Sequence, residues 1–221
     1  MRLGIVGGTG KLGSGLAMRW VRAGHSIAIG SRDGAKARAC AEDLAKRGFP
    51  ATGGDNAWAA SEGEVVILTV PYEAHAETLR AIAAAVAGKV LVDVTVPLKP
   101  PRVTRVQLPA GQAAALETQA LVGAATPVAA ALHHVSATHL ADLAHAIDCD
   151  VLVACDDPKA KAVTLGLVSD LGARGLDAGP LVNAIALESL TPVLIHLNKT
   201  YKSLGAGVVF TDLAGAGKPK G

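Results

Sequence analysis

The sequence has few aromatic residues, few cysteines and little net charge, and each shortage excludes something. Aromatic residues make up 3% of the 221 residues, so the core must be built from small aliphatic side chains, which suit tight helix-on-sheet packing. The three cysteines, Cys40, Cys149 and Cys155, form no Cys-x-x-Cys pair. This argues against a disulfide framework and predicts a reducing, cytoplasmic location. The net charge of +2 favours neither a nucleic-acid partner nor a membrane surface.

Long hydrophobic runs are missing as well. No apolar stretch reaches the roughly 18 residues that a membrane-spanning helix needs. No charged N-terminal segment leads into such a run, so we expect neither a signal peptide nor membrane association. Half of the residues are nevertheless apolar, which is enough for a sizeable core, and the length allows one large domain or one with a small annex.

What the chain does have is a glycine-rich opening. Residues 2–6 form a short apolar run rich in β-formers, and residues 7–13 read Gly-Gly-Thr-Gly-Lys-Leu-Gly. A helical pattern follows to about Arg22, and a second apolar run covers residues 26–30. This succession of strand, glycine turn, helix and strand is typical of the first half of a dinucleotide-binding unit.

Each glycine of this turn has an expected role. Gly8 should allow the sharp turn out of the strand, Gly10 should let a pyrophosphate approach the backbone, and Gly13 should let the helix pack closely. The free N–H groups at the start of the helix, together with its dipole, should hold the phosphates. The competing interpretation, a purely structural turn, explains the glycines but not their position between strand and helix.

The end of the second strand distinguishes NADP from NAD. An NAD site usually has Asp or Glu there, to hold the ribose 2′-hydroxyl. This chain has Ser31 and Arg32, with Lys36 one helical turn further on and Thr9 within reach. Arg32 can bind a 2′-phosphate with two hydrogen bonds, Ser31 can donate another, and Lys36 adds positive charge. We therefore predict NADP(H), with a merely solvated basic loop as the alternative.

The rest of the chain alternates strand and helix patterns. This predicts an α/β fold, a Rossmann-type doubly wound parallel sheet with a small C-terminal α-rich domain. We expect an NADP-binding domain over residues 1–178, a small helical domain over 179–213, and a disordered tail over 214–221 that contains little but Gly, Ala, Lys and Pro. The expected strands after the second one are residues 64–70, 89–94, 129–134, 151–154 and 175–178, and residues 49–54 read as a loop with at most a short strand.

Few other residues suggest chemistry. His133 and His134 end a predicted strand, so one of them, for which we choose His133, should face the ligand crevice. The spacing of the histidines and cysteines matches no common metal site, so we predict no metal. Asp156 and Asp157 are best explained as a helix N-cap, and Glu188, inside an apolar run, as a buried group with an internal hydrogen bond. No nucleophile is recognisable, and a nicotinamide enzyme needs none.

At this point the chain resembles the F420-dependent NADP oxidoreductases (NADPH:coenzyme F420 oxidoreductases) over nearly its whole length. The specific blocks are Leu-Asp-Ala-Gly-Pro-Leu at residues 176–181 and Leu-Glu-Ser-Leu-Thr-Pro at residues 187–192; the resemblance also rests on residues 7–13, 30–32 with Lys36, 69–73, 131–133 and 155–157. It implies reversible hydride transfer between C5 of the deazaflavin F420 and C4 of the nicotinamide of NADP. It also implies a homodimer.

The resemblance further implies roles for individual residues. Pyrophosphate and ribose would be bound by Thr9, Gly10, Lys11 and Leu12, and the 2′-phosphate by Ser31, Arg32 and Lys36. The nicotinamide side would be lined by Val70, Pro71, His75, Val96 and Ala137. The deazaflavin pocket would include His133, Gly179, Pro180 and Asn183. The chain departs from the usual pattern at residues 134–136 and from Leu204 onward, both near the expected second-substrate pocket.

Two alternatives stay open. The chain could be an NADPH-dependent reductase of another acceptor, such as a flavin, a quinone, a ferric chelate or an imine. It could also be a non-catalytic NADP(H)-sensing module, because the cofactor-binding motifs are stronger than any motif for catalysis.

Overall fold

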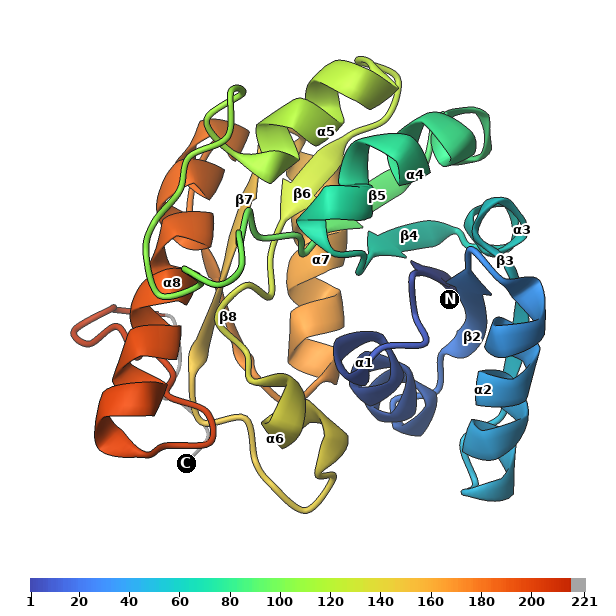
Figure 1. Ribbon diagram of the computed structural model, residues 1–221, viewed down its shortest axis with the longest axis horizontal. Coiled ribbons are helices and arrows are strands. Elements are labelled where there is room, and N and C mark those ends of the chain that lie inside the picture. Colours follow the sequence, from blue (N-terminus) through green and yellow to red (C-terminus); the bar gives the residue numbers. More distant parts are fainter. Residues whose placement is uncertain (216–221) are drawn as a thin grey trace.

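The computed structural model describes residues 1–215, and the tail predicted to be disordered, residues 214–221, lies outside that range from residue 216 onward. Eight strands form one sheet with helices on both faces (Figure 1). In chain order the elements are β1 (Arg2–Val6), α1 (Lys11–Arg22), β2 (Ser26–Ser31), α2 (Gly34–Lys46), β3 (Ala51–Asp55), α3 (Asn56–Glu62), β4 (Val65–Leu68), α4 (Tyr72–Val86), β5 (Val90–Asp93), α5 (Ala114–Val122), β6 (Val128–Ala130), α6 (Ala137–Ala141), β7 (Asp150–Cys155), α7 (Pro158–Asp170), β8 (Arg174–Asp177), the 3₁₀ turn η1 (Leu181–Asn183) and α8 (Ala184–Tyr201).

The strand order is β3-β2-β1-β4-β5-β6-β7-β8, so the sheet is doubly wound from β1 as predicted. Strands β1 to β6 are parallel to one another. The pairing of β6 with β7 is antiparallel, and β8 then runs parallel to β7. The carboxyl ends of β7 and β8 therefore lie at the opposite edge of the sheet from those of β1 to β6. This reversal was not predicted, and it matters for the site.

The core lies on both faces of the sheet and follows the alternation of strand side chains. Leu3 and Ile5 of β1 pack into one apolar cluster with α1, α2 and α7, whereas Val6 packs into a second cluster with α4, α5 and α8. All four residues of β4 are buried, as expected of a parallel strand covered on both faces. Trp20 is 1% exposed, and its indole N–H donates to the Leu167 carbonyl oxygen at 3.0 Å, which ties α1 to α7.

Two strand predictions needed adjustment. Residues 51–55 lie in the segment read as a loop with at most a short strand, and they form a five-residue parallel strand, β3, beside β2. In contrast, β6 ends at Ala130, and Leu132 has a left-handed backbone with φ of 66°. His133 and His134 therefore follow the strand instead of ending it, and the alternation argument used to choose between them does not apply.

The C-terminal region packs on the same sheet. Leu181, Ala184 and Leu187 join the second apolar cluster; the division of the chain at residue 178 stays a prediction. Residues 181–201 are long and apolar enough to cross a membrane by length and composition. However, this segment packs against α5 and contains Pro192 and the buried Glu188, which fits a helix of the protein's own core better.

Candidate dinucleotide-binding site

The glycine turn between β1 and α1 is shaped by three glycines, but not quite as expected. The left-handed residue is Gly7, with φ of 75°, so Gly7 rather than Gly8 provides the sharp turn. A Cβ on Gly13 would lie 2.5 Å from the Cα of Gly8, so these two glycines allow the helix to meet the turn itself. A Cβ on Gly10 would meet nothing within 4 Å, and the backbone there is open to a ligand.

The first turn of α1 faces this open backbone. Its N-cap is Gly10, and no side chain caps it, whereas Asp33, Asp55 and Asp157 cap α2, α3 and α7. The free N–H groups and the helix dipole are thus available to an anion directly after the glycine turn. Lys11 is exposed at the same place. Leu12 is partly buried and packs against the first apolar cluster.

The end of β2 carries the predicted 2′-phosphate residues. Ser31 is nearly buried, whereas Arg32 and Lys36 are exposed, and neither cation has an ion-pair partner among the described residues. The carboxylate of the nearby acid, Asp33, caps α2 and accepts the N–H groups of Ala35 at 2.9 Å and Lys36 at 3.4 Å. The charge left at the end of β2 is therefore positive, which suits a phosphate and not a ribose diol alone.

A groove of about 440 Å³ joins these features at the carboxyl ends of β1, β2 and β4. The residues predicted for the cofactor that line it are Thr9, Gly10, Ser31, Arg32, Lys36, Val70 and Pro71. The sequence reasoning missed the others, which are Gly7, Asn56, Thr69, Glu73, Ala74, Glu77 and Thr78. A groove at this edge, at the point where the strand order reverses, is where open α/β sheets bind ligands.

Asn56 is the most informative of the missed residues. Its side-chain oxygen accepts the N–H of Gly7 at 3.1 Å, so it holds the first residue of the glycine turn. Asn56 follows directly on β3. Had residues 51–55 been taken as a strand, the position of Asn56 at its carboxyl end would have identified it.

His75 does not lie where the sequence reasoning placed it. Its side chain is 1% exposed, and its Nε2 lies 3.0 Å from Asp93 Oδ2 and 2.7 Å from Thr118 Oγ1. The neighbouring Ala74 lines the groove instead. One residue along a helix rotates the side chain by about 100°, so an error of one position exchanges a groove-lining residue for a core residue.

Asp93, which ends β5, is the centre of this buried network. It also accepts the hydroxyl of Thr118 at 2.5 Å and the backbone N–H of Thr95 at 2.8 Å. Burial alone would raise the pKa of this carboxyl, but the hydrogen bonds from His75, Thr118 and Thr95 together with the charge of His75 hold it below its ordinary value. Through its hydrogen bond with the Thr95 N–H, Asp93 holds the start of the Thr95–Val96 turn from the buried side.

His133 and His134 are both buried beyond the end of β6. His134 Nε2 lies 2.9 Å from the Leu187 carbonyl oxygen of α8. Both ring nitrogens of His133 lack a hydrogen-bond partner among the described residues. Burial, reinforced by His134 and opposed by Asp93, lowers the pKa of His133 to about 3, so its ring is neutral at physiological pH.

Gly179, Pro180 and Asn183 are far from this edge, which corrects the prediction that they join the second-substrate pocket of the same chain. Gly179 accepts the N–H of Cys155 at the end of β7, and Cys155 lies opposite Ala129 near the start of β6. The reason is the reversed direction of β7 and β8. Asp156 and Asp157 lie at the same edge as structural groups: Asp157 caps α7, and Asp156 accepts the N–H of Leu181.

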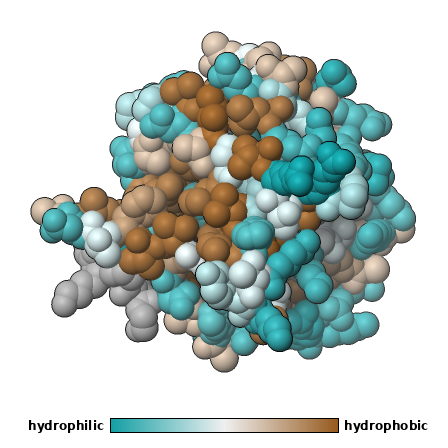
Figure 2. Space-filling model, turned by 60° about the vertical axis from the view of Figure 1, so that its left-hand side comes forward, coloured by the Kyte–Doolittle hydropathy of each residue, from teal (hydrophilic) through white to brown (hydrophobic). Residues whose placement is uncertain are grey.

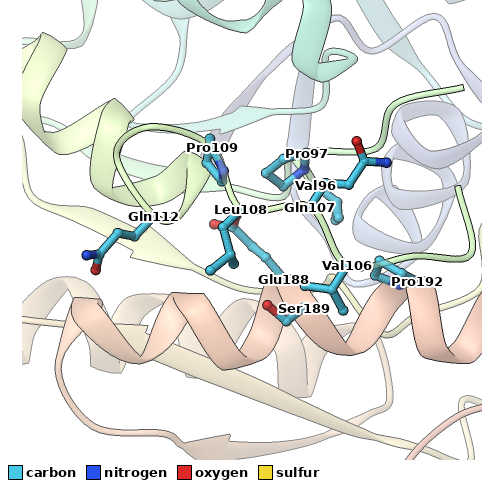
Figure 3. A pocket seen from close by; sticks show the side chains of 10 residues that line it. All are labelled: Val96, Pro97, Val106, Gln107, Leu108, Pro109, Gln112, Glu188, Ser189 and Pro192. Atoms are coloured by element: carbon cyan, nitrogen blue, oxygen red, sulfur yellow. The ribbon is translucent and has the colours of Figure 1, made fainter. Parts of the chain in front are cut away.

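Val96 and Ala137 do not line the groove. Ala137 begins α6, which packs against α1. Val96 lines a separate small cavity of about 10 Å³ between the loop that follows β5 and helix α8. Figure 3 shows Glu188, Ser189 and Pro192 on α8 facing Val96, Pro97 and the 106–109 segment. The cavity is about the size of one water molecule, so a planar ring system does not enter it in this conformation.

Glu188 closes the α8 side of that cavity. It is 3% exposed, and its two carboxyl oxygens accept the N–H groups of Ala114 at 2.7 Å and Ala115 at 3.0 Å. Burial raises the pKa of Glu188 to about 8; the two N–H bonds oppose this rise, and Asp93 and Glu117 add to it. The expected internal hydrogen bond is confirmed, and its partner is the start of α5.

A doubly wound sheet, an uncapped helix after a glycine turn and a groove that ends on free cations define a Rossmann-type dinucleotide-binding protein. The chain matches a family profile described as "NADP oxidoreductase coenzyme F420-dependent" over residues 2–97. It is 40% identical to an F420-dependent NADP reductase of Methanothermobacter marburgensis, over 96% of this chain and 99% of that protein. A reductase of the same description from Methanocaldococcus jannaschii is 38% identical, over 96% and 99% of the two chains.

Solved structures agree on the fold. An Arthrobacter structure described as an F420-dependent NADP-reductase has a TM-score of 0.78 at 24% identity, over 95% of this chain and 99% of that chain. A pyrroline carboxylate reductase of Plasmodium falciparum with NADP bound has a TM-score of 0.55 at 12% identity, over 91% of this chain and 67% of that one. With the identities to the curated relatives, the conclusion is plain: the chain belongs to the F420-dependent NADP reductase family.

Proposed function

We propose that this protein transfers a hydride reversibly between NADP(H) and the deazaflavin coenzyme F420. The observation that carries the proposal is the groove itself, in which an open glycine turn leads to two unpaired cations at the end of β2. The family assignment supplies the second substrate. NADP would supply the chemistry, a hydride donor or acceptor at C4 of its nicotinamide.

The residues of the groove would each do a part of the binding. The backbone at Gly10 and the first turn of α1 would receive the pyrophosphate. Arg32 and Lys36 would hold the 2′-phosphate, with the hydroxyls of Thr9 and Ser31 as hydrogen-bond donors. Asn56 would act indirectly, by holding Gly7 in place.

The nicotinamide would then lie toward Val70 and Pro71, which line the groove after β4. Val96 and Ala137, which follow β5 and begin α6, would flank it, because all these residues lie at one edge of the sheet. Hydride transfer requires the reacting carbons about 3–3.5 Å apart. Apolar walls suit that stacking and exclude water. Of the deazaflavin residues predicted, only His133 lies at this edge, and its unpartnered ring nitrogens could accept or donate a hydrogen bond.

The experiment mixes purified protein with NADPH and oxidised F420 and follows the absorbance of both. The proposal expects one F420 reduced for each NADPH oxidised. Oxidation of NADPH by a flavin, a quinone, a ferric chelate or an imine, but not by F420, would point to another reductase. Tight NADPH binding without turnover of any acceptor would point to a sensor.

We also propose that the protein is a homodimer and that α8 lies at the interface. Figure 2 shows hydrophobic residues gathered on the face that carries α8. Val193 of α8 is 43% exposed, and Val106 and Leu108, which line the small cavity beside α8, are 47% and 56% exposed. Exposed apolar surface of this kind marks interaction sites. Sedimentation analysis should give a dimer mass that Val193→Asp lowers. Ala45→Asp, on the exposed side of α2, is the matched control and should not lower it; a monomeric native protein would contradict the proposal.

A further inference from the structure

Glu188 stands out among the buried groups that the binding site does not use. It is an almost fully buried carboxyl, and the described groups around it offer no cation: Asp93 ends β5, Glu117 belongs to α5, and the neighbouring His133 and His134 are held neutral by burial, which lowers the pKa of both. The Ala114 and Ala115 N–H bonds use one lone pair on each carboxyl oxygen. Each oxygen thus keeps a position for a proton.

The place of this carboxyl in the fold is as informative as its burial. Glu188 lines the water-sized cavity whose opposite wall is formed by Val96 and Pro97 (Figure 3). The polar side chains of Gln107, Gln112 and Ser189 also line it, and a cavity of this size with several polar partners can hold one water molecule. Val96 follows β5, at the edge where the nicotinamide would lie. The cavity therefore lies between the Glu188 carboxyl and the Val96–Pro97 segment, which would flank the nicotinamide.

The reaction needs a proton as well as a hydride. Reduction of F420 by NADPH adds two electrons and one proton as a hydride at C5, and the product is complete only when a second proton binds at N1 of the same ring system. Solvent can provide that proton only if water enters the stacked site, and apolar walls oppose this. A proton held inside the protein avoids the difficulty.

We propose that Glu188 is a neutral carboxylic acid in the working enzyme and supplies the proton that accompanies hydride transfer to F420. The O–H bond of Glu188 breaks, an N–H bond forms at N1 of the deazaflavin through the water-sized cavity, and the carboxylate left behind takes a proton from solvent. The balance is NADPH, F420 and one proton giving NADP⁺ and reduced F420. In the reverse direction the ionised carboxylate accepts the same proton. This inference rests on the proposed function.

Its first test does not involve turnover. The infrared spectrum of the free protein at pH 7, minus that of Glu188→Gln, should contain the C=O band of a protonated carboxylic acid. That band should titrate away at about pH 8, the value to which burial raises the pKa of Glu188. An ionised carboxylate at pH 7 would overturn the proposal whether or not F420 is the substrate.

The second test is kinetic. In Glu188→Gln the rate of F420 reduction should fall by about 100-fold or more, as expected when a general acid is lost, while the NADPH dissociation constant stays as in the native protein. The native rate should fall as pH rises above about 8, and the variant should lose this dependence. Native rates and an unchanged pH profile in Glu188→Gln would overturn the proposal. Failure of the native protein to reduce F420 would instead contradict the proposed function.

A matched control separates proton supply from simple packing. Glu117→Gln changes a carboxyl on α5 that bonds Tyr72 and Gly111 and does not line the cavity. Glu117 contributes to the raised pKa of Glu188. This variant should therefore keep the native maximal rate of F420 reduction, and the pH at which that rate falls should be lower than in the native protein. A loss of rate in Glu117→Gln equal to that in Glu188→Gln would indicate a general structural effect and would count against the proposal.

Discussion

Replacing Arg32 by alanine is the perturbation that most directly probes the NADP preference. Arg32 lines the groove with Lys36, is exposed and has no ion-pair partner among the described residues. Its guanidinium is therefore free for the 2′-phosphate of NADPH and has nothing to bind in NADH. A hydrogen bond to a charged group contributes about 1.5–3 kcal/mol. Arg32→Ala should thus raise the dissociation constant of NADPH by about 10- to 150-fold and leave that of NADH nearly unchanged.

The assay is a fluorescence titration of each nucleotide at fixed salt, because exposed charge interactions are screened. Arg38→Ala is the matched control: Arg38 is an exposed arginine on α2, the helix that follows Arg32 and carries Lys36, and it does not line the groove. It should bind both nucleotides as the native protein does. Equal weakening of NADPH and NADH by Arg32→Ala would refute the 2′-phosphate role.

Three further predictions concern stability. Gly7→Ala forces a side chain into a backbone with φ of 75° and within 2.6 Å of Val70 Cγ1; chemical denaturation should show a loss of at least about 1–2 kcal/mol, and an unchanged midpoint would contradict the turn geometry. Asp93→Ala removes the buried acceptor of His75, Thr118 and Thr95 and should lower the free energy of unfolding by about 3–5 kcal/mol. His75→Ala should lower it clearly less, and the reverse order would be inconsistent with Asp93 as the centre of the network. Because the folded-state pKa of Glu188 is raised from 4.5 to about 8, its contribution to stability is complete below about pH 4.5 and is lost as pH rises to about 8. Relative to Glu188→Gln, the native protein should lose up to about 5 kcal/mol across that window, at about 1.4 kcal/mol per pKa unit, and parallel stability curves would contradict the raised value.

The predictable parts of this fold are those governed by local patterns. The continuous apolar run of β4 needs burial on both faces, and the glycine turn between β1 and α1 needs positions without a Cβ, so both can be read from neighbouring residues. The positions of Arg32 and Lys36 follow from the end of β2, which the same pattern sets. Gly10, Arg32 and Lys36 line the same groove; that they bind NADP stays a prediction.

The parts that could not be predicted depend on direction and rotation. An apolar strand looks the same whichever way it runs, so nothing in residues 150–155 reveals that β7 is antiparallel to β6. Gly179 and Pro180, which the resemblance assigned to the deazaflavin pocket, therefore lie at the opposite edge of the sheet from the groove. His75 and Ala74 differ by one helical position, which an approximate helix boundary does not resolve. The partners of Glu188 at the start of α5 are distant in sequence and become visible only in the folded chain.

The central claim is that a hydride passes directly from nicotinamide to deazaflavin within one site. The measurement that tests it is transfer of deuterium from NADPH labelled at C4 to oxidised F420, with the product analysed by mass spectrometry. The account predicts that, with the label on the face of the nicotinamide that reacts, deuterium appears at C5 of reduced F420 without exchange with solvent. Reduced F420 without deuterium from either labelled face, or no reduced F420 although NADPH is bound, would contradict it.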